Sequence, residues 1–157
     1  MFQKIFAWYK RNYELNLYFV TVLFVWQLVH LYWMFADVIL LRILGHEFWQ
    51  VGKIGNIVIS LVDYTEIPAI IFTSIFYLSE LHKEWKWKNI LLLILINSQW
   101  LHLFWITDEV VVAQWTGTAA IILPAWLSWL AIMIDYLELP VIYDTIKKSI
   151  LSLQKTY

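Results

Sequence analysis

The chain has 157 residues, a formal net charge of −1 and a composition that is 62% hydrophobic. A soluble domain is about 45–50% apolar, so the composition argues against a soluble globular protein. No basic face is visible, so we expect no nucleic-acid partner. The absence of cysteine excludes disulfides, thiolate metal sites and cysteine nucleophiles.

The first segment, residues 1–14, mixes positive and aromatic side chains. Such a mixture is typical of a short helix that lies at the lipid headgroups. The apolar run that follows is too long for the hydrophobic region of a signal peptide, and no small-residue cleavage site follows it. The residues that carry this interpretation are Phe2, Lys4, Phe6, Trp8, Tyr9, Lys10 and Arg11.

Four apolar stretches follow along the chain, and each is long enough to span a bilayer, which takes about 20 residues. They predict an all-α integral membrane protein, a four-helix transmembrane bundle that forms a single domain over residues 1–157. The expected helices cover residues 15–41, 54–79, 89–112 and 119–143.

The distribution of positive charge predicts the orientation of these helices. The N-terminal segment, the loop at 80–88 and the C-terminal tail hold most of the lysine and arginine. Positive residues gather in cytoplasmic loops, so we expect both termini in the cytoplasm and the protein in the plasma or inner membrane. The lipid bilayer is then its main partner, and a bundle of this size could also form a homodimer.

The scarce polar residues of the helices occur twice, 72 residues apart. The heptapeptide at 27–33, QLVHLYW, reappears at 99–105 as QWLHLFW, and the hexapeptide at 63–68, DYTEIP, reappears at 135–140 as DYLELP. Gly45 pairs with Gly117 at the same offset, and acidic Asp37 pairs with acidic Glu109. We therefore expect two tandem repeats, 13–84 and 85–157.

Each repeat forms a helical hairpin that returns the chain to its starting side of the membrane. Two such hairpins insert in the same orientation. They are then related by a pseudo-two-fold axis along the membrane normal, unlike the inverted repeats of many transporters. Equivalent residues of the two hairpins can meet at the centre of the bundle.

Helical spacing predicts that the repeated polar residues form layers. Gln27 and His30 share one face of the first helix, and Asp63 and Glu66 share one face of the second. At about 1.5 Å per residue, His30 should lie level with Asp63 if Asp37 and Asn56 both lie near the outer surface. Gln27 should then lie level with Glu66.

Ionisable side chains inside a membrane are costly and are by default candidates for function. Both repeats together contain two histidines and four carboxylates, which is also the ligand inventory of di-iron and di-manganese bundles, although the residues are distributed differently over the helices. Two divalent ions would neutralise four carboxylates. The expected metal ligands are His30, Asp63, Glu66, His102, Asp135 and Glu138.

This inventory predicts a dinuclear site for a divalent transition metal, with iron, manganese or zinc as the ions that suit nitrogen and oxygen ligands. We expect Glu66 and Glu138 to bridge or chelate, Asp63 and Asp135 to be terminal ligands, and the histidines to supply nitrogen. Such a centre could serve redox chemistry, hydrolysis or metal handling.

Further residues complete the predicted site. Gln27 and Gln99 should orient the histidines or carboxylates, or act as weak oxygen ligands. The helices should kink at Pro68 and Pro140, which free a main-chain carbonyl. Tyr64 and Tyr136, beside the carboxylates, also belong to this supporting set. Polar residues nearer the outside could form an entry to the site, and these are Asp37, Glu109 and Asn56.

Three other interpretations of the same residues stay open. The acidic and histidine side chains could form a pathway for protons or cations, as such chains do in membranes. His30 and His102, at the same depth on equivalent helices, could ligate a haem. The set could also be a structural network of hydrogen bonds between helices.

Overall fold

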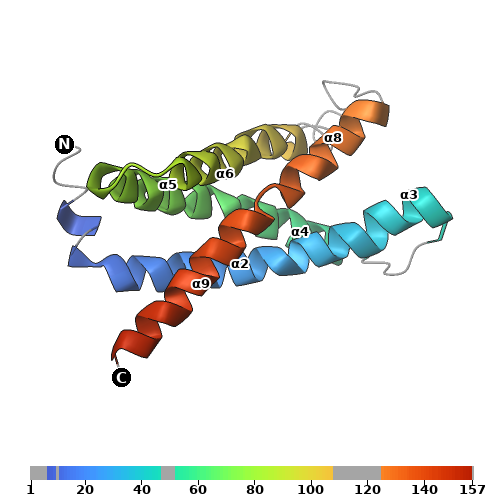
Figure 1. Ribbon diagram of the computed structural model, residues 1–157. Helices are drawn as coiled ribbons and strands as arrows, with labels where there is room; N and C mark the ends of the chain where they lie inside the picture. Colours follow the sequence, from blue (N-terminus) through green and yellow to red (C-terminus); the bar gives the residue numbers. More distant parts are fainter. Residues whose placement is uncertain (1–6, 10, 47–51, 108–124, 157) are drawn as a thin grey trace.

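The computed structural model describes residues 7–9, 11–46, 52–107 and 125–156, and within these ranges every regular element is helical (Figure 1). The prediction of an all-α protein is thus confirmed for the described residues. The elements are α2 (Tyr13–Trp33), η1 (Met34–Ile39), α3 (Leu40–Leu44), α4 (Lys53–Tyr64), α5 (Glu66–Lys83), α6 (Trp87–Ile106), α8 (Ala125–Tyr136) and α9 (Leu139–Thr156).

The first rod of the bundle is α2, η1 and α3 taken together. The middle segment η1 is a π-helix of six residues, a rare element that is often found at functional sites. Thr107, which follows α6 and is equivalent to Phe35 of η1, is also π-helical. The rod ends at Gly45, whose φ of 71° is the left-handed conformation that glycine adopts readily at a helix C-terminus.

The second rod, predicted as one helix over 54–79, is interrupted at the single residue Thr65, whose φ of −70° and ψ of −11° are still right-handed helical. Its first half, α4, ends at Tyr64, and α5 begins at Glu66 after the turn residue Thr65. Pro68 lies in the first turn of α5, where its missing N–H is tolerated. Pro68 has no N–H to donate to the carbonyl of Tyr64, so the interruption one turn before it is the local disturbance that the sequence predicts there. The interruption lies at the predicted carboxylates.

The fourth rod has a similar break. α8 ends at Tyr136 and α9 begins at Leu139, with Leu137 and Glu138 in the turn between them. Pro140 again occupies the first turn of the new helix. Across the turn, the N–H groups of Leu137 and Glu138 each donate to the carbonyl three residues earlier. The proline, which has no N–H, follows just after this turn.

The predicted helix bounds need further correction. The first rod runs from Tyr13 to Leu44, longer than the predicted 15–41, and α9 continues to Thr156, well beyond the predicted end at 143. The segment 108–124, which includes Glu109, Gly117 and the predicted start of the fourth helix, lies outside the described residues.

The rods pack side by side into one bundle. α5 packs along α6, α2 packs against α9 and α5, and α6 packs against α8. Figure 1 shows the start of α2, the connection from α5 to α6 and the end of α9 at one end of the bundle, with α3 and the start of α8 at the other. We call these the terminal end and the loop end.

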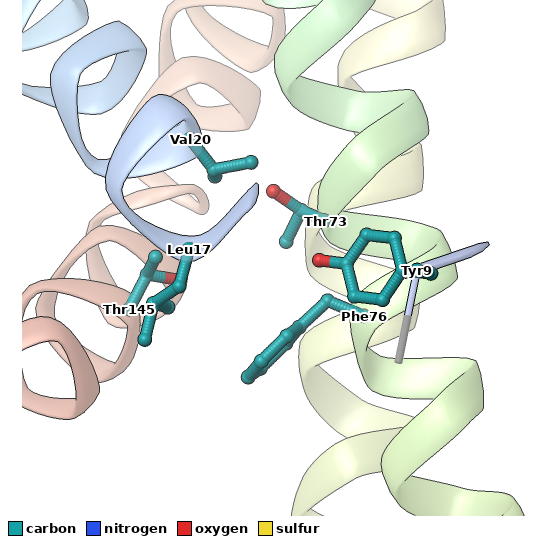
Figure 2. A pocket seen from close by; sticks show the side chains of 6 residues that line it. All are labelled: Tyr9, Leu17, Val20, Thr73, Phe76 and Thr145. Atoms are coloured by element: carbon teal, nitrogen blue, oxygen red, sulfur yellow. The ribbon is translucent and has the colours of Figure 1, made fainter. Parts of the chain in front are cut away.

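At the terminal end, the short N-terminal segment closes a pocket between α2, α5 and α9. Tyr9 is 1% exposed and its side chain lies close to Phe76 and Thr73 (Figure 2). The pocket has no room for a water-sized probe and is also lined by Leu17, Val20 and Thr145. Thr73 lies two turns from Glu66 along α5, so this pocket is separate from the predicted site.

The bundle is apolar outside and partly polar inside. Large exposed side chains along the helices include Val22, Leu61, Ile94, Trp126 and Met133. Two helical stretches of the described residues, Tyr13–Leu44 and Leu61–Lys83, are long and apolar enough to cross a membrane. The polar interior holds the predicted site.

Candidate metal centre

Two histidine–aspartate pairs form the centre of the bundle. His30 on α2 places Nδ1 at 2.5 Å from Oδ1 of Asp63 on α4, and His102 on α6 places Nδ1 at 2.5 Å from Oδ1 of Asp135 on α8. All four residues are buried, with at most 6% exposure. His30 therefore lies beside Asp63, at the level that helical spacing predicts.

The two pairs meet across the bundle. The rings of His30 and His102 lie 6.0 Å apart, centroid to centroid, and Nε2 of His30 lies 3.9 Å from Oδ2 of Asp135. His30, Asp63 and His102 can each offer one ligand atom within 4.8 Å of the others. We call the four residues of these pairs the histidine layer.

The two glutamates are buried without hydrogen bonds. Glu66 opens α5 and Glu138 lies just before α9, and each is 1% exposed. All four of their carboxylate oxygens lack a hydrogen-bond partner among the described residues. Glu66 is close enough to Glu138, Asp63 and Asp135 to interact electrostatically with all three.

Gln27 and Gln99 are fully buried beside the two helix breaks. Nε2 of Gln27 donates hydrogen bonds to the carbonyl of Val62 at 2.8 Å and to the hydroxyl of Thr65 at 3.0 Å. Nε2 of Gln99 donates to the carbonyl of Ile134, also at 2.8 Å. The nitrogen ends of both amides therefore bond to the interrupted rods, and the part of the amides in orienting histidine or carboxylate stays a prediction.

The two tyrosines link the hairpins to each other. The hydroxyl of Tyr136 donates to the carbonyl of Leu31 on α2 at 3.1 Å. The hydroxyl of Tyr64 lies 2.9 Å from that of Thr107, which in turn donates to the carbonyl of Leu103 on α6. Both tyrosines are half-buried and support neighbouring helices, and among the described residues neither forms a hydrogen bond to a predicted metal ligand.

The predicted entry residues are only partly described. Asp37 lies in η1 and is half-buried. Asn56 lies in α4, but its side chain is outside the described part of the structure, and so is the whole of Glu109. The entry therefore stays a prediction.

Sequence reasoning missed a buried ionic cluster near the terminal end. Asp144 is only 4% exposed and accepts hydrogen bonds from Tyr77, Lys88 and Lys148. Lys148 also binds Glu80 at 2.7 Å. Burial alone would raise the pKa of Asp144, but the hydrogen bonds from Lys148, Lys88 and Tyr77 lower the pKa below its usual range.

The arrangement of the histidine layer suits metal coordination. Metal-binding histidines commonly use one ring nitrogen for the metal and the other for a carboxylate that fixes the ring. Asp63 and Asp135 lie at Nδ1 in both pairs, and Nε2 of His30 and of His102 is buried without a hydrogen-bond partner among the described residues. The aspartates are thus placed to orient the histidines, and their part as terminal ligands stays a prediction.

Comparison of the chain with protein-family models, with curated proteins and with solved structures finds no match.

Proposed function

We propose that the protein is an integral membrane protein of four crossing rods whose core binds a dinuclear carboxylate–histidine metal centre with iron, manganese or zinc. The rods form two parallel hairpin repeats with both termini in the cytoplasm. Such a centre could carry out redox or hydrolytic chemistry on a substrate that reaches it from the membrane.

The distribution of exposed and buried residues supports the membrane placement. Fully buried Gln27, Gln99, Glu66 and Glu138 contrast with exposed leucine, isoleucine, valine and tryptophan on every long helix. An apolar surface that covers all the rods would favour aggregation in water. In a bilayer the same surface faces lipid.

Contacts that recur at the repeat offset support the duplication. The hydrogen bond from Gln27 to Val62 is matched by one from Gln99 to Ile134, and the His30–Asp63 pair by His102–Asp135. In each case both partners are 72 residues apart in the two copies, and the distances are equal. An internal pseudo-two-fold axis accounts for this agreement.

The single observation that carries the metal proposal is the set of buried, unpartnered ligand atoms between the two hairpins. Burying an ionised group without a partner is expensive, and a membrane-buried group usually has a functional partner. Two divalent cations would balance the four carboxylates and bind the free imidazole nitrogens. A purely structural network would leave the glutamate oxygens without hydrogen bonds.

The test is elemental analysis of the detergent-purified protein, with an optical spectrum of the same sample. The proposal expects about two divalent ions per chain, as in dinuclear carboxylate bundles, and loss of transition metal in a His30→Ala/His102→Ala variant. The matched control is His46→Ala/His82→Ala, because both of these histidines are exposed. Equal metal in the two variants would refute the proposal.

A second candidate function is the transport of protons or cations through the same residues. The observation that favours it is the break in two rods beside the carboxylates, since discontinuous helices form the ion sites of many transporters. Cation flux into liposomes that depends on Glu66 and Glu138 would support transport.

The group of His30, Asp63 and His102, with ligand atoms within 4.8 Å of one another, suits an ion better than a porphyrin. A Soret band in the optical spectrum would instead indicate a haem.

A further inference from the structure

Four further polar side chains of the core carry buried oxygen atoms that have no hydrogen-bond partner among the described residues. They are Gln27, Glu66, Gln99 and Glu138, each 0 or 1% exposed, and we call them the oxygen layer. Each member lies three residues from a member of the histidine layer. Within α2 and α6, where Gln27 and Gln99 precede the histidines, three residues correspond to about 4.5 Å along the helix axis. The two layers are therefore neighbours at different depths.

Hydrogen bonds fix the orientation of the Gln27 amide. The hydroxyl of Thr65 donates to the carbonyl of Val62 at 2.6 Å, so it can only accept from Gln27. The Val62 carbonyl also accepts only. Both partners therefore require the nitrogen end of the amide, and the oxygen must point the other way.

The amide oxygens are left free by this arrangement. The carbonyl of Ile134 requires the nitrogen end of Gln99 in the same way. Oε1 of Gln27 and Oε1 of Gln99 are both buried and have no hydrogen-bond partner in the part of the chain that the structure describes. Hydrogen bonds from the amide nitrogens therefore fix the orientation of both amides, and the amide oxygens take no part in fixing it.

The free ligand atoms of the oxygen layer are six oxygens on four side chains. Four come from Glu66 and Glu138, and two from the amides. Calcium takes about six to eight oxygen ligands from carboxylates and amide carbonyls. One divalent cation would also neutralise the two glutamates, as a second would neutralise Asp63 and Asp135 in the histidine layer.

We propose that the oxygen layer binds a hard divalent cation of the calcium or magnesium type, separate from the transition metal of the histidine layer. The two sites of the centre are then chemically unlike. This inference rests on the proposed function, because it assigns a different kind of ion to each half of the dinuclear site.

Calcium titration of the detergent-purified, metal-loaded protein tests the inference, with isothermal calorimetry and radioactive calcium as readouts. We expect one calcium ion per chain. The variant Glu66→Gln/Glu138→Gln should weaken binding at least 100-fold, because it keeps the shape of the layer and removes its charge. The control Glu14→Gln/Glu84→Gln alters two exposed carboxylates and should bind like the parent.

A second variant guards against misfolding. Glu66→Asp/Glu138→Asp keeps both charges and shortens the side chains, so it should bind calcium with affinity between those of the parent and the glutamine variant. Absence of calcium binding in the parent, or equal binding in the parent and the glutamine variant, would overturn the inference.

The test of the calcium site and the test of the transition-metal centre can fail independently of each other. His30→Ala/His102→Ala should lose the transition metal and keep calcium. Histidine-dependent transition metal without calcium binding would refute the oxygen-layer site alone. Calcium binding without histidine-dependent metal would refute the transition-metal centre and leave the oxygen layer standing.

Discussion

At the residue scale, Gln27 and Gln99 could either stabilise the fold or bind a ligand, and their hydrogen bonds separate these two roles. The carbonyl of Val62 already accepts hydrogen bonds from the N–H and hydroxyl of Thr65. Removal of Gln27 therefore leaves no main-chain acceptor unsatisfied at this break. A fully buried amide whose oxygen has no partner is better explained by a ligand than by a contribution to stability.

Replacement of both glutamines by leucine tests this interpretation. Hydrogen bonds between membrane helices contribute about 0.6 kcal/mol on average, so each of Gln27→Leu and Gln99→Leu should change the free energy of unfolding by less than about 1 kcal/mol. The double variant should nevertheless bind calcium more weakly. The control is Gln154→Leu, at an exposed site. A large loss of stability in mixed micelles, with unchanged calcium affinity, would favour a structural role.

The buried Asp144 predicts a pH-dependent stability. Its pKa is lowered in the folded protein from the usual 3.8, so its contribution is fully present above that value and is lost as the pH falls through the lower folded pKa. Asp144→Asn should reduce the free energy of unfolding at pH 7 by about 1–3 kcal/mol, as expected for hydrogen bonds to a charged group.

Measurements at several pH values give the sign of this effect. The difference between parent and Asp144→Asn should stay constant from neutral pH to about pH 5, and should shrink below about pH 4. The control Glu84→Gln removes an exposed ion pair with Lys86 and should cost at most about 1 kcal/mol. A difference that grows on acidification would contradict the account of Asp144.

At the element scale, the broken rods position the carboxylates. Glu66 and Glu138 both lie where one helix has ended and the next begins. The proline of each repeat follows within the first turn of the new helix, where it causes little strain. The sequence alone predicts a disturbance at Pro68 and Pro140. Whether it appears as a kink or a break depends on packing and on the hydrogen bonds of Gln27 and Gln99.

Substitution of the proline tests whether it stabilises the break. Pro68→Ala restores an N–H that can bond to the carbonyl of Tyr64 and continue the helix. The free energy of unfolding should change by less than about 1 kcal/mol, because the first turn tolerates either residue. Bound metal should decrease as Glu66 moves.

The contrasting variant is Ile71→Pro, at an exposed position in the interior of α5. It should cost about 3 kcal/mol or more. Equal destabilisation by the two substitutions, or unchanged metal content in Pro68→Ala, would show that the proline does not set the geometry of the site.

At the scale of the whole molecule, the arrangement of the rods predicts the topology in the membrane. The start of α2, the α5–α6 connection and the end of α9 lie at the terminal end (Figure 1), together with Lys83, Lys86 and Lys88. By the positive-inside rule, the proposed membrane protein would have this end in the cytoplasm. The loop end, with His46, would then face outward.

Cysteine labelling can test the topology, because the chain has no cysteine of its own. We expect Trp85→Cys and Leu153→Cys to react with a membrane-impermeant maleimide only from the cytoplasmic side, and His46→Cys only from the opposite side. All three positions are exposed. Labelling of all three from one side of sealed vesicles would rule out the four-rod topology.

Local patterns predict much of the fold and of the candidate site. Helical periodicity and the repeat place His30 beside Asp63, and the structure agrees. The partners of Asp144 escape such reasoning, because Tyr77 and Lys88 are distant in sequence and only packing brings them near. The role of Asp63 stays a prediction, since depth alone does not distinguish a metal ligand from a residue that orients a histidine.

The measurement that tests the central claim most directly is X-ray absorption spectroscopy at the edge of the bound transition metal. We predict outer-shell scattering from two imidazole rings, and nitrogen and oxygen ligands at about 2.0–2.2 Å if the metal is zinc. The signal should disappear in His30→Ala/His102→Ala. A metal surrounded by oxygen ligands alone would contradict the histidine-layer centre. A metal signal no stronger than that of the buffer would contradict it as well.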